Sequence, residues 1–345
     1  MSRLTIGIDL AKNIFQVHGI DAAGQVVIVQ RLRRAQLLQY FSKLDPCLIG
    51  MEACGSAHHW ARELTAIGHD VKLMVPAYVK PYVKRGKNDM VDAEAICEAV
   101  TRPNMRFVPV KTALQQSILM VHRSRSLLIR QRTMLVNALR GHLTEIGIVA
   151  PIGIERTAEL VERVLAPDST ALDVPPLVRD IVVSLVGQIN SLTTEVKVLE
   201  TKIRDWHRTS EASRRLATIP GVGVITATAL AATITDPLYF RSGRALAAWL
   251  GLTPRSNSSG GKHRLGRISK AGDRYLRTLL VVGATAVIRH VKHKVHGPLI
   301  EWVRKLLLTK SARLTTVALA NKMARIAWAV MARNTVYSHP VAATA

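Results

Sequence analysis

The pattern of apolar and polar positions along the first hundred residues predicts alternating strands and helices. Short runs rich in β-branched residues predict strands at 4–9, 14–19, 25–30, 47–52 and 71–75. Helical patterns at 35–44 and near 58–67 precede the fourth and fifth of these strands. Because a helical crossover leads into each of these two strands, we expect both to run parallel to their predecessors. The order βββαβαβα predicts an α/β domain with a mixed sheet flanked by helices.

Two long helical patterns follow, at residues 112–146 and 176–207. The second carries an apolar seam with spacings of three and four, which predicts a coiled-coil arm: Val182, Leu185, Ile189, Leu192, Val196, Leu199, Ile203 and Trp206. The first has a seam of Leu114, Ile118, Val121, Leu128 and Leu135 that also contains two arginines, Arg125 and Arg132. These arginines either pair with acids or snorkel, or they contact nucleic acid.

The connector between the long helices, residues 151–176, has a helical pattern at 155–165 and is interpreted as the tip of a helical hairpin. Paired long helices commonly serve subunit association, so we expect a homodimer or homotetramer. The remainder, 217–332, is mostly helical and is broken by a Gly/Ser-rich stretch at 255–262. We therefore expect three domains: 1–110, a dimerisation arm at 111–212, and 213–345.

Charge is distributed unevenly along the chain. The net charge of +24 divides into +2 for residues 1–100, +6 for 101–215 and +16 for 216–345, where only three acids occur. Such a surface is typical of proteins that replace counterions along a phosphate backbone. A solubilising role is the alternative, but solubility does not require one third of a chain to be almost free of acids. Because aromatic residues are few, we expect contact through phosphates rather than base stacking.

The three cysteines, Cys47, Cys54 and Cys97, have no CxxC spacing and argue against a disulfide framework. We expect no secretion signal and no membrane span, since no uncharged apolar run reaches about 18 residues. These features predict a cytoplasmic, nucleoid-associated protein. The histidines His58, His59, His290, His293 and His296 are interpreted as parts of basic faces rather than as zinc ligands.

Four acids are candidates for a Mg²⁺ site. Asp9 and Glu52 stand at the ends of predicted strands, and Asp89 and Asp92 stand at a predicted helix start. Carboxylates gathered at such ends hold Mg²⁺ in many enzymes that act on phosphodiesters. Asp89 could instead cap the helix, and Asp9 or Glu52 alone would be read as a surface carboxylate.

The last third contains two further motifs. Residues 218–227 have the form of a helix-hairpin-helix turn, in which Gly221 and Gly223 would allow a phosphate to approach a helix N-terminus; an ordinary glycine turn is the alternative. A serine in the loop that follows Gly251-Leu252-Thr253-Pro254 could reach a phosphate closely, although a linker serine is the alternative. Cations expected to bind nucleic acid surround this loop: Arg255, Lys262, Arg264, Arg267, Lys270 and Arg274.

Five ordered motifs stand out along the chain: Gly7–Lys12, Met51–Ala53, Lys87–Ala93, Ile219–Gly223, and Gly251–Pro254 continuing through Ser258–Gly261 to Ile268–Gly272. Together they resemble the DEDD-type insertion-sequence transposases, which are recombinases guided by a structured RNA encoded by the element. The resemblance covers nearly the whole chain. The stretch Ser258–Arg264 differs in detail from other branches of the family.

The resemblance implies an RNase H-like N-terminal domain, similar to Holliday-junction resolvases, with Mg²⁺ bound by Asp9, Glu52, Asp89 and Asp92. It also implies a C-terminal transposase domain whose serine becomes linked to a DNA phosphate. By register that serine is Ser259, with Ser258 as its neighbour. In the family the arm pairs subunits, and one site combines acids from one protomer with serine from another.

Together these observations predict a transposase or site-specific DNA recombinase that uses Mg²⁺, a guide RNA and a serine nucleophile. One alternative is a metal-dependent junction nuclease in which water attacks and Ser259 takes no part. Another is a non-enzymatic basic DNA-binding protein that does not use the acids.

Overall fold

The computed structural model describes residues 4–84, 88–149, 153–166, 174–257, 264–291 and 297–338. The chain divides into two compact units, one ending at Gln116 and one beginning at Ser117. The division into three domains stays a prediction.

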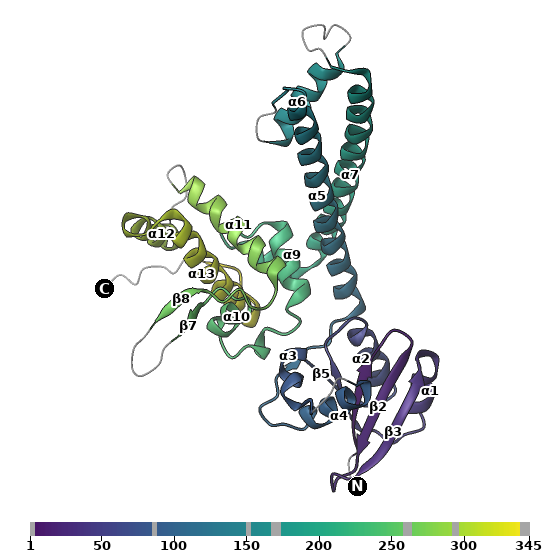
Figure 1. Ribbon diagram of the computed structural model, residues 1–345. Coiled ribbons are helices and arrows are strands. Elements are labelled where there is room, and N and C mark those ends of the chain that lie inside the picture. Colours follow the sequence, from purple (N-terminus) through teal and green to yellow (C-terminus); the bar gives the residue numbers. More distant parts are fainter. Residues whose placement is uncertain are drawn as a thin grey trace, which may run out of the picture. The chain divides into compact units, whose positions relative to one another are not determined.

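The first unit is built on a mixed sheet with the strand order β3-β2-β1-β4-β5-β6 (Figure 1). Its strands are β1 Thr5–Leu10, β2 Ile14–Ile20, β3 Val26–Arg33, β4 Leu48–Glu52, β5 Asp70–Met74 and β6 Phe107–Val108. As predicted, β1, β4 and β5 run parallel to one another, whereas β2 pairs antiparallel with β1 and β3 pairs antiparallel with β2. The sequence pattern missed β6, because two residues are too few for a recognisable alternation.

Helices cover both faces of this sheet. Ile6, Ile8 and Met51 point to one face and join the core formed with α1 and α2. Gly7 and Gly50 lie on the opposite face, beneath α4. The helices and 3₁₀ turns of this unit are η1 Arg34–Gln36, α1 Leu37–Phe41, α2 Ala57–Ala66, α3 Pro76–Val79, η2 Lys80–Tyr82 and α4 Asp89–Val100.

The two long helices pack against each other in opposite directions, with a third helix at the far end (Figure 1). They are α5 Ala113–Glu145 and α7 Pro176–Thr209, and the third is α6 Ile154–Leu165. Arg125 on α5 donates two hydrogen bonds to Oε1 of Glu200 on α7, at 2.9 and 2.6 Å. Arg132 donates to Thr193 Oγ1 at 3.4 Å. The structure therefore favours the interpretation in which these two arginines bond to partners within the arm.

The predicted seam of α7 is the packed side of that helix, since each of its eight residues is buried or half-buried. The seam predicted for α5 is partly wrong. Leu114 is 63% exposed, and the buried residues of α5 are Ile118, His122, Val136, Leu139 and Leu143. The packed side of α5 keeps spacings of three and four but is shifted by one position from the predicted seam, because it includes His122 and Val136 in place of Val121 and Leu135.

The rest of the second unit is a helical core with one small hairpin. Its helices are α8 Glu211–Leu216, α9 Val224–Thr233, η4 Pro237–Tyr239, α10 Gly243–Trp249, α11 Arg274–His290, α12 Pro298–Thr309 and α13 Ala312–Ala332. The hairpin pairs β7 Pro254–Ser256 with β8 Leu265–Ile268. The predicted helical C-terminal region is thus confirmed. Across the described ranges, every helix is too short or too polar to cross a membrane.

Candidate functional site

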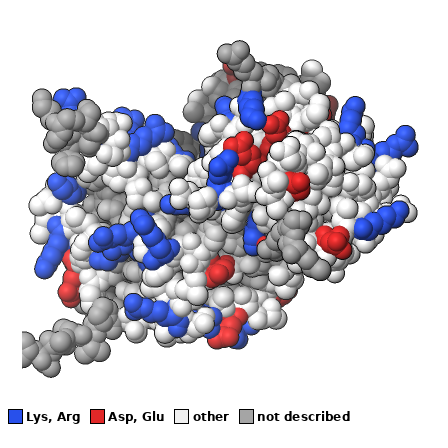
Figure 2. Space-filling model, turned by 90° about the horizontal axis from the view of Figure 1, so that it is seen from below, with Lys and Arg blue, Asp and Glu red and all other residues white. Residues whose placement is uncertain are grey.

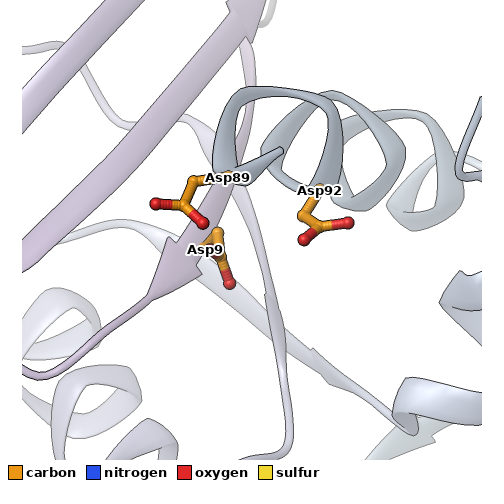
Figure 3. Close-up of side chains that lie close together, drawn as sticks. All are labelled: Asp9, Asp89 and Asp92. Carbon is orange, nitrogen blue, oxygen red and sulfur yellow. The ribbon is translucent and has the colours of Figure 1, made fainter. Parts of the chain in front are cut away.

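Three of the four candidate acids meet where β1 ends and α4 begins. Asp9 lies near the end of β1, and Asp89 and Asp92 lie in the first turn of α4. One carboxylate oxygen from each acid lies within 4.8 Å of those of the other two. Figure 3 shows the three side chains gathered at this junction. The structure thus joins acids that are 80 residues apart in the chain.

Glycine at position 7 allows α4 to lie directly on β1. A Cβ atom added to Gly7 would lie 2.2 Å from the carbonyl oxygen of Ala93 and 2.4 Å from the backbone nitrogen of Cys97. Side chains alternate along a strand, so Gly7 and Asp9 share one face of the sheet. The close approach of α4 at Gly7 therefore places its first turn beside Asp9.

The N-cap of α4 is Asn88 rather than Asp89. The Asn88 side chain accepts a hydrogen bond from the backbone N–H of Met90 at 3.1 Å. One of the unpaired donors at the helix start is thereby satisfied. The Asp89 carboxylate is consequently available to join Asp9 and Asp92, and the capping alternative for Asp89 is not what the structure contains.

Glu52 lies beside the three aspartates but outside the set that shares the 4.8 Å spacing. Ile8 pairs with Met51 in the parallel β1–β4 ladder, so the next residues along the strands, Asp9 and Glu52, end neighbouring strands on the same face. Burial, followed by the charges of Asp9 and Asp92, raises the pKa of Glu52. Glu52 therefore belongs to the same electrostatic environment.

The donor set fits a hard divalent cation. Burial, followed by the charges of Asp92 and Asp89, raises the pKa of Asp9. The three aspartates offer only carboxylate oxygens, which Mg²⁺ and related cations prefer. A dication at this point would offset the repulsion between the acids.

Comparison with known proteins decides the family. Residues 6–148 match the DEDD transposase of IS110 elements, and residues 213–297 match the transposase IS116/IS110/IS902 family. The chain is 48% identical to a probable family 20 transposase of Pseudomonas aeruginosa over 98% of its length and 99% of the relative's. It is 40% identical to the transposase for insertion sequence element IS1328 of Yersinia enterocolitica over 96% and 98% of the two chains. The chain belongs to the IS110/IS116 family of transposases.

The protein is therefore an insertion-sequence transposase, an enzyme that cleaves and joins DNA and accordingly binds it. The mixed sheet and the helical C-terminal region are consistent with a DEDD, RNase H-like transposase. The DEDD-type match and the three clustered aspartates together indicate that a transposase of this kind uses a divalent metal.

The candidate nucleophile loop joins the two strands of the hairpin β7–β8. Ser258, Ser259 and Lys262 lie outside the residues that the structure describes. On the two sides of the loop, the Asn257 N–H donates to the Arg264 carbonyl oxygen at 2.9 Å and so closes the hairpin. The candidate cations that the structure describes are all exposed: Arg255, Arg264, Arg267, Lys270 and Arg274. Figure 2 shows lysine and arginine side chains at many points of the face that it displays.

The two glycines of the 218–227 motif have different surroundings. Gly221 has a positive φ of 84°, and a Cβ added there would lie 2.9 Å from the Gly283 carbonyl oxygen on α11. Gly223 is the N-cap residue of α9 and has open space around it. Packing alone therefore accounts for Gly221, whereas Gly223 is placed where a phosphate could approach the backbone.

Sequence reasoning missed the residues that position the acids. Gly7 and Gly50 precede Asp9 and Glu52 by two positions each, and Asn88 precedes Asp89 directly. The repeated Gly-x-acid spacing was a signal that could have marked one face of two paired strands. Asn before a predicted helix is an ordinary N-cap signal.

Proposed function

We propose that this transposase cuts and rejoins DNA through attack by Ser259, with Mg²⁺ held by Asp9, Glu52, Asp89 and Asp92. The observation that carries this proposal is the convergence of three carboxylates from β1 and α4. The strongly basic C-terminal third of the same chain supports it. The family resemblance adds the serine and an RNase H-like core akin to that of junction resolvases.

In the proposed step, Oγ of Ser259 forms a bond to phosphorus while one ester P–O bond of the DNA backbone breaks. The electron pair of that bond leaves with the deoxyribose oxygen, which ends with the serine proton. A hydroxyl of a second DNA end then reverses the step, so the phosphodiester is conserved and no ATP is required. A bound Mg²⁺ supplies charge stabilisation at the phosphate. The described cations Arg255 and Arg264 flank the loop and would attract the DNA backbone toward it.

We further propose that a structured noncoding RNA encoded by the element selects the target, and that the enzyme works as a homodimer or homotetramer. Pairing of α5–α7 arms between subunits would allow acids from one protomer and Ser259 from another to share a phosphate. Gly223 at the start of α9 would serve backbone contact in a helix-hairpin-helix manner. RNA that co-purifies with the protein, and that maps to a foldable segment flanking its gene, would support the guide.

The test is strand cleavage of element-end DNA by the purified full-length protein with its RNA and Mg²⁺. Asp9→Asn and Asp92→Asn should each lower cleavage by at least about 10³-fold while DNA binding persists. Ser259→Ala should abolish the covalent protein–DNA adduct on a denaturing gel, with Ser258→Ala as the neighbouring control. Adduct formation that depends on Ser258 instead would reassign the nucleophile.

Metal binding has a readout that does not require activity. Mg²⁺ at 100 times its Kd should stabilise the wild-type protein by about 2.7 kcal/mol. In EDTA, Asp9→Asn should melt at a higher temperature than wild type, because one repelling charge is gone, and it should lose the Mg²⁺ response.

Unchanged cleavage by Ser259→Ala would instead favour the junction nuclease, and persistent recombination by Asp92→Asn would reject the metal site.

A further inference from the structure

A groove of about 1520 Å³ lies on the second unit. The hairpin β7–β8 contributes Pro254, Gly266, Arg267 and Ile268 to its lining, and the lining continues along α13 from Arg313 to Ala329. The start of α10 and Trp302 of α12 complete it. The groove therefore joins segments that are distant in sequence but belong to one unit.

The lining contains many apolar side chains, and its charged residues are all basic. Six lysines or arginines contribute to it, and no aspartate or glutamate does: Arg244, Arg267, Lys270, Arg313, Lys322 and Arg325. None of these six forms an ion pair with a carboxylate in the part of the chain that the structure describes. Among the described residues no carboxylate lies within ion-pair distance of them, which favours attraction of a polyanion.

The aromatic residues of the groove are engaged with protein groups. Nζ of Lys322 lies 4.1 Å from the centroid of the Trp302 ring. The Trp328 indole N–H donates to the carbonyl oxygens of Pro237 and Phe240. Burial and the neighbouring Arg325 lower the pKa of Lys322. An anion here would favour charged Lys322, so phosphate contact suits this groove better than base stacking does.

We propose that this groove binds the phosphodiester backbone of the DNA strand beside the phosphate that the transposase cleaves. The inference rests on the proposed function, because the hairpin that walls the groove is the one that leads into Ser258 and Ser259. The strand attacked by such a serine is DNA, which selects DNA over RNA as the occupant. Contacts through phosphates predict binding that is independent of sequence and sensitive to salt.

The test uses the full-length protein and labelled DNA of arbitrary sequence, with fluorescence anisotropy measured from 50 to 200 mM salt. The groove variant Arg313→Gln/Arg325→Gln removes two exposed cations from α13. The control Arg289→Gln/Lys305→Gln removes two exposed cations that do not line the groove. Thermal melting checks that both variants keep the wild-type fold.

The groove variant should bind DNA about 30-fold more weakly at 0.15 M salt, and its slope of log K against log salt should be shallower by about 1.4–1.8. The control should keep the wild-type slope. On element-end DNA, neutral methylphosphonate linkages beside the cleaved phosphate should weaken wild-type binding but not further weaken the groove variant. Equal DNA affinity of groove variant and control, or a loss confined to RNA binding, would overturn the proposal.

Failure of this inference and failure of the proposed function give different results. Ser259→Ala should retain the groove-dependent DNA affinity and salt slope while it loses the covalent adduct. A groove variant that binds DNA like wild type, in a protein whose Ser259 adduct forms normally, would reject the groove alone. If the groove variant binds DNA of arbitrary sequence more weakly than wild type does, but no adduct depends on Ser259, both the nucleophile and the placement of the strand beside it would be rejected.

Discussion

The substitution Gly7→Ala tests whether the packing of α4 on β1 sets the metal site. The added Cβ would meet three backbone atoms of α4 closer than 3.0 Å: the Ala93 oxygen and the Cys97 nitrogen and Cα. Backbone atoms inside a helix cannot rotate away as a side chain can. The helix as a whole must therefore move outward by about 1 Å, and it carries Asp89 and Asp92 away from Asp9.

Two magnitudes follow from that displacement. Overpacking of this kind costs about 1–3 kcal/mol of unfolding free energy. A shift of about 1 Å in a catalytic group can lower the rate about 100-fold. Gly7→Ala should therefore lose about 100-fold in Mg²⁺-dependent strand cleavage and most of the Mg²⁺-induced thermal stabilisation, even where the protein remains folded.

The assay is cleavage of element-end DNA over a Mg²⁺ titration, with urea unfolding measured on the same preparations. Gly55→Ala is the control in the same unit, because a Cβ at Gly55 meets nothing within 4 Å. The cleavage rate and Mg²⁺ response of Gly50→Ala should lie between those of Gly7→Ala and Gly55→Ala, since its Cβ meets side-chain atoms of Val100 and Met74. A Gly7→Ala protein with wild-type metal response and wild-type cleavage would refute the claim that this contact positions the acids.

Two further predictions concern the base of the arm. His122 is 1% exposed, and burial followed by Arg125 lowers its pKa from 6.5 to about 4. Because the folded protein favours the neutral His122 ring, its full contribution to the free energy of unfolding is present above pH 6.5, and about 3 kcal/mol of it is lost as the pH falls to 4. Urea unfolding from pH 4 to 7.5 should show that His122→Gln removes this loss. A pH profile of the variant that runs parallel to that of the wild type would contradict the assignment. The Arg125–Glu200 pair has side chains only 17% and 28% exposed, so Arg125→Leu should cost about 1.5–3 kcal/mol. The exposed Arg123→Leu should cost less than about 0.5 kcal/mol, and Arg125→Leu/Glu200→Leu should recover part of the loss; equal melting of both single variants would argue against the pair.

The parts of the fold that follow a single periodicity could be predicted from the sequence. Alternation in Thr5–Leu10 identifies β1, and the heptad spacing from Val182 to Trp206 identifies the packed side of α7. α7 keeps one packed side along its length, whereas β1 is buried on both faces and Thr5 to Ile8 are all buried. In α5 the packed side also keeps spacings of three and four, but it contains His122, Arg125 and Arg132, which a pattern of apolar residues does not mark.

Much of the candidate site was open to sequence reasoning, but its internal geometry was not. That four acids gather at strand ends and a helix start follows from topology. Which three of them share one cation-sized space depends on how closely α4 approaches the sheet, and this is set by Gly7 against Ala93 and Cys97. The basic groove was also beyond prediction, because Arg244, Lys270 and Arg313 come from separate segments that only the folded unit brings together.

The repeated spacing of glycine and acid links metal binding to the docking of α4. Gly7 pairs with Gly50 across the parallel strands, and Asp9 and Glu52 each follow two residues later on the same face. The two glycines make the flat surface on which α4 lies, while α4 brings Asp89 and Asp92 to the acids of the strands. The contact between α4 and the sheet therefore brings four negative charges together, and the repulsion between these charges weakens that contact. A divalent cation removes that opposition, so its binding should stabilise the α4–β1 contact and slow amide exchange in α4 more than in α2, which packs on the other face and carries none of these acids.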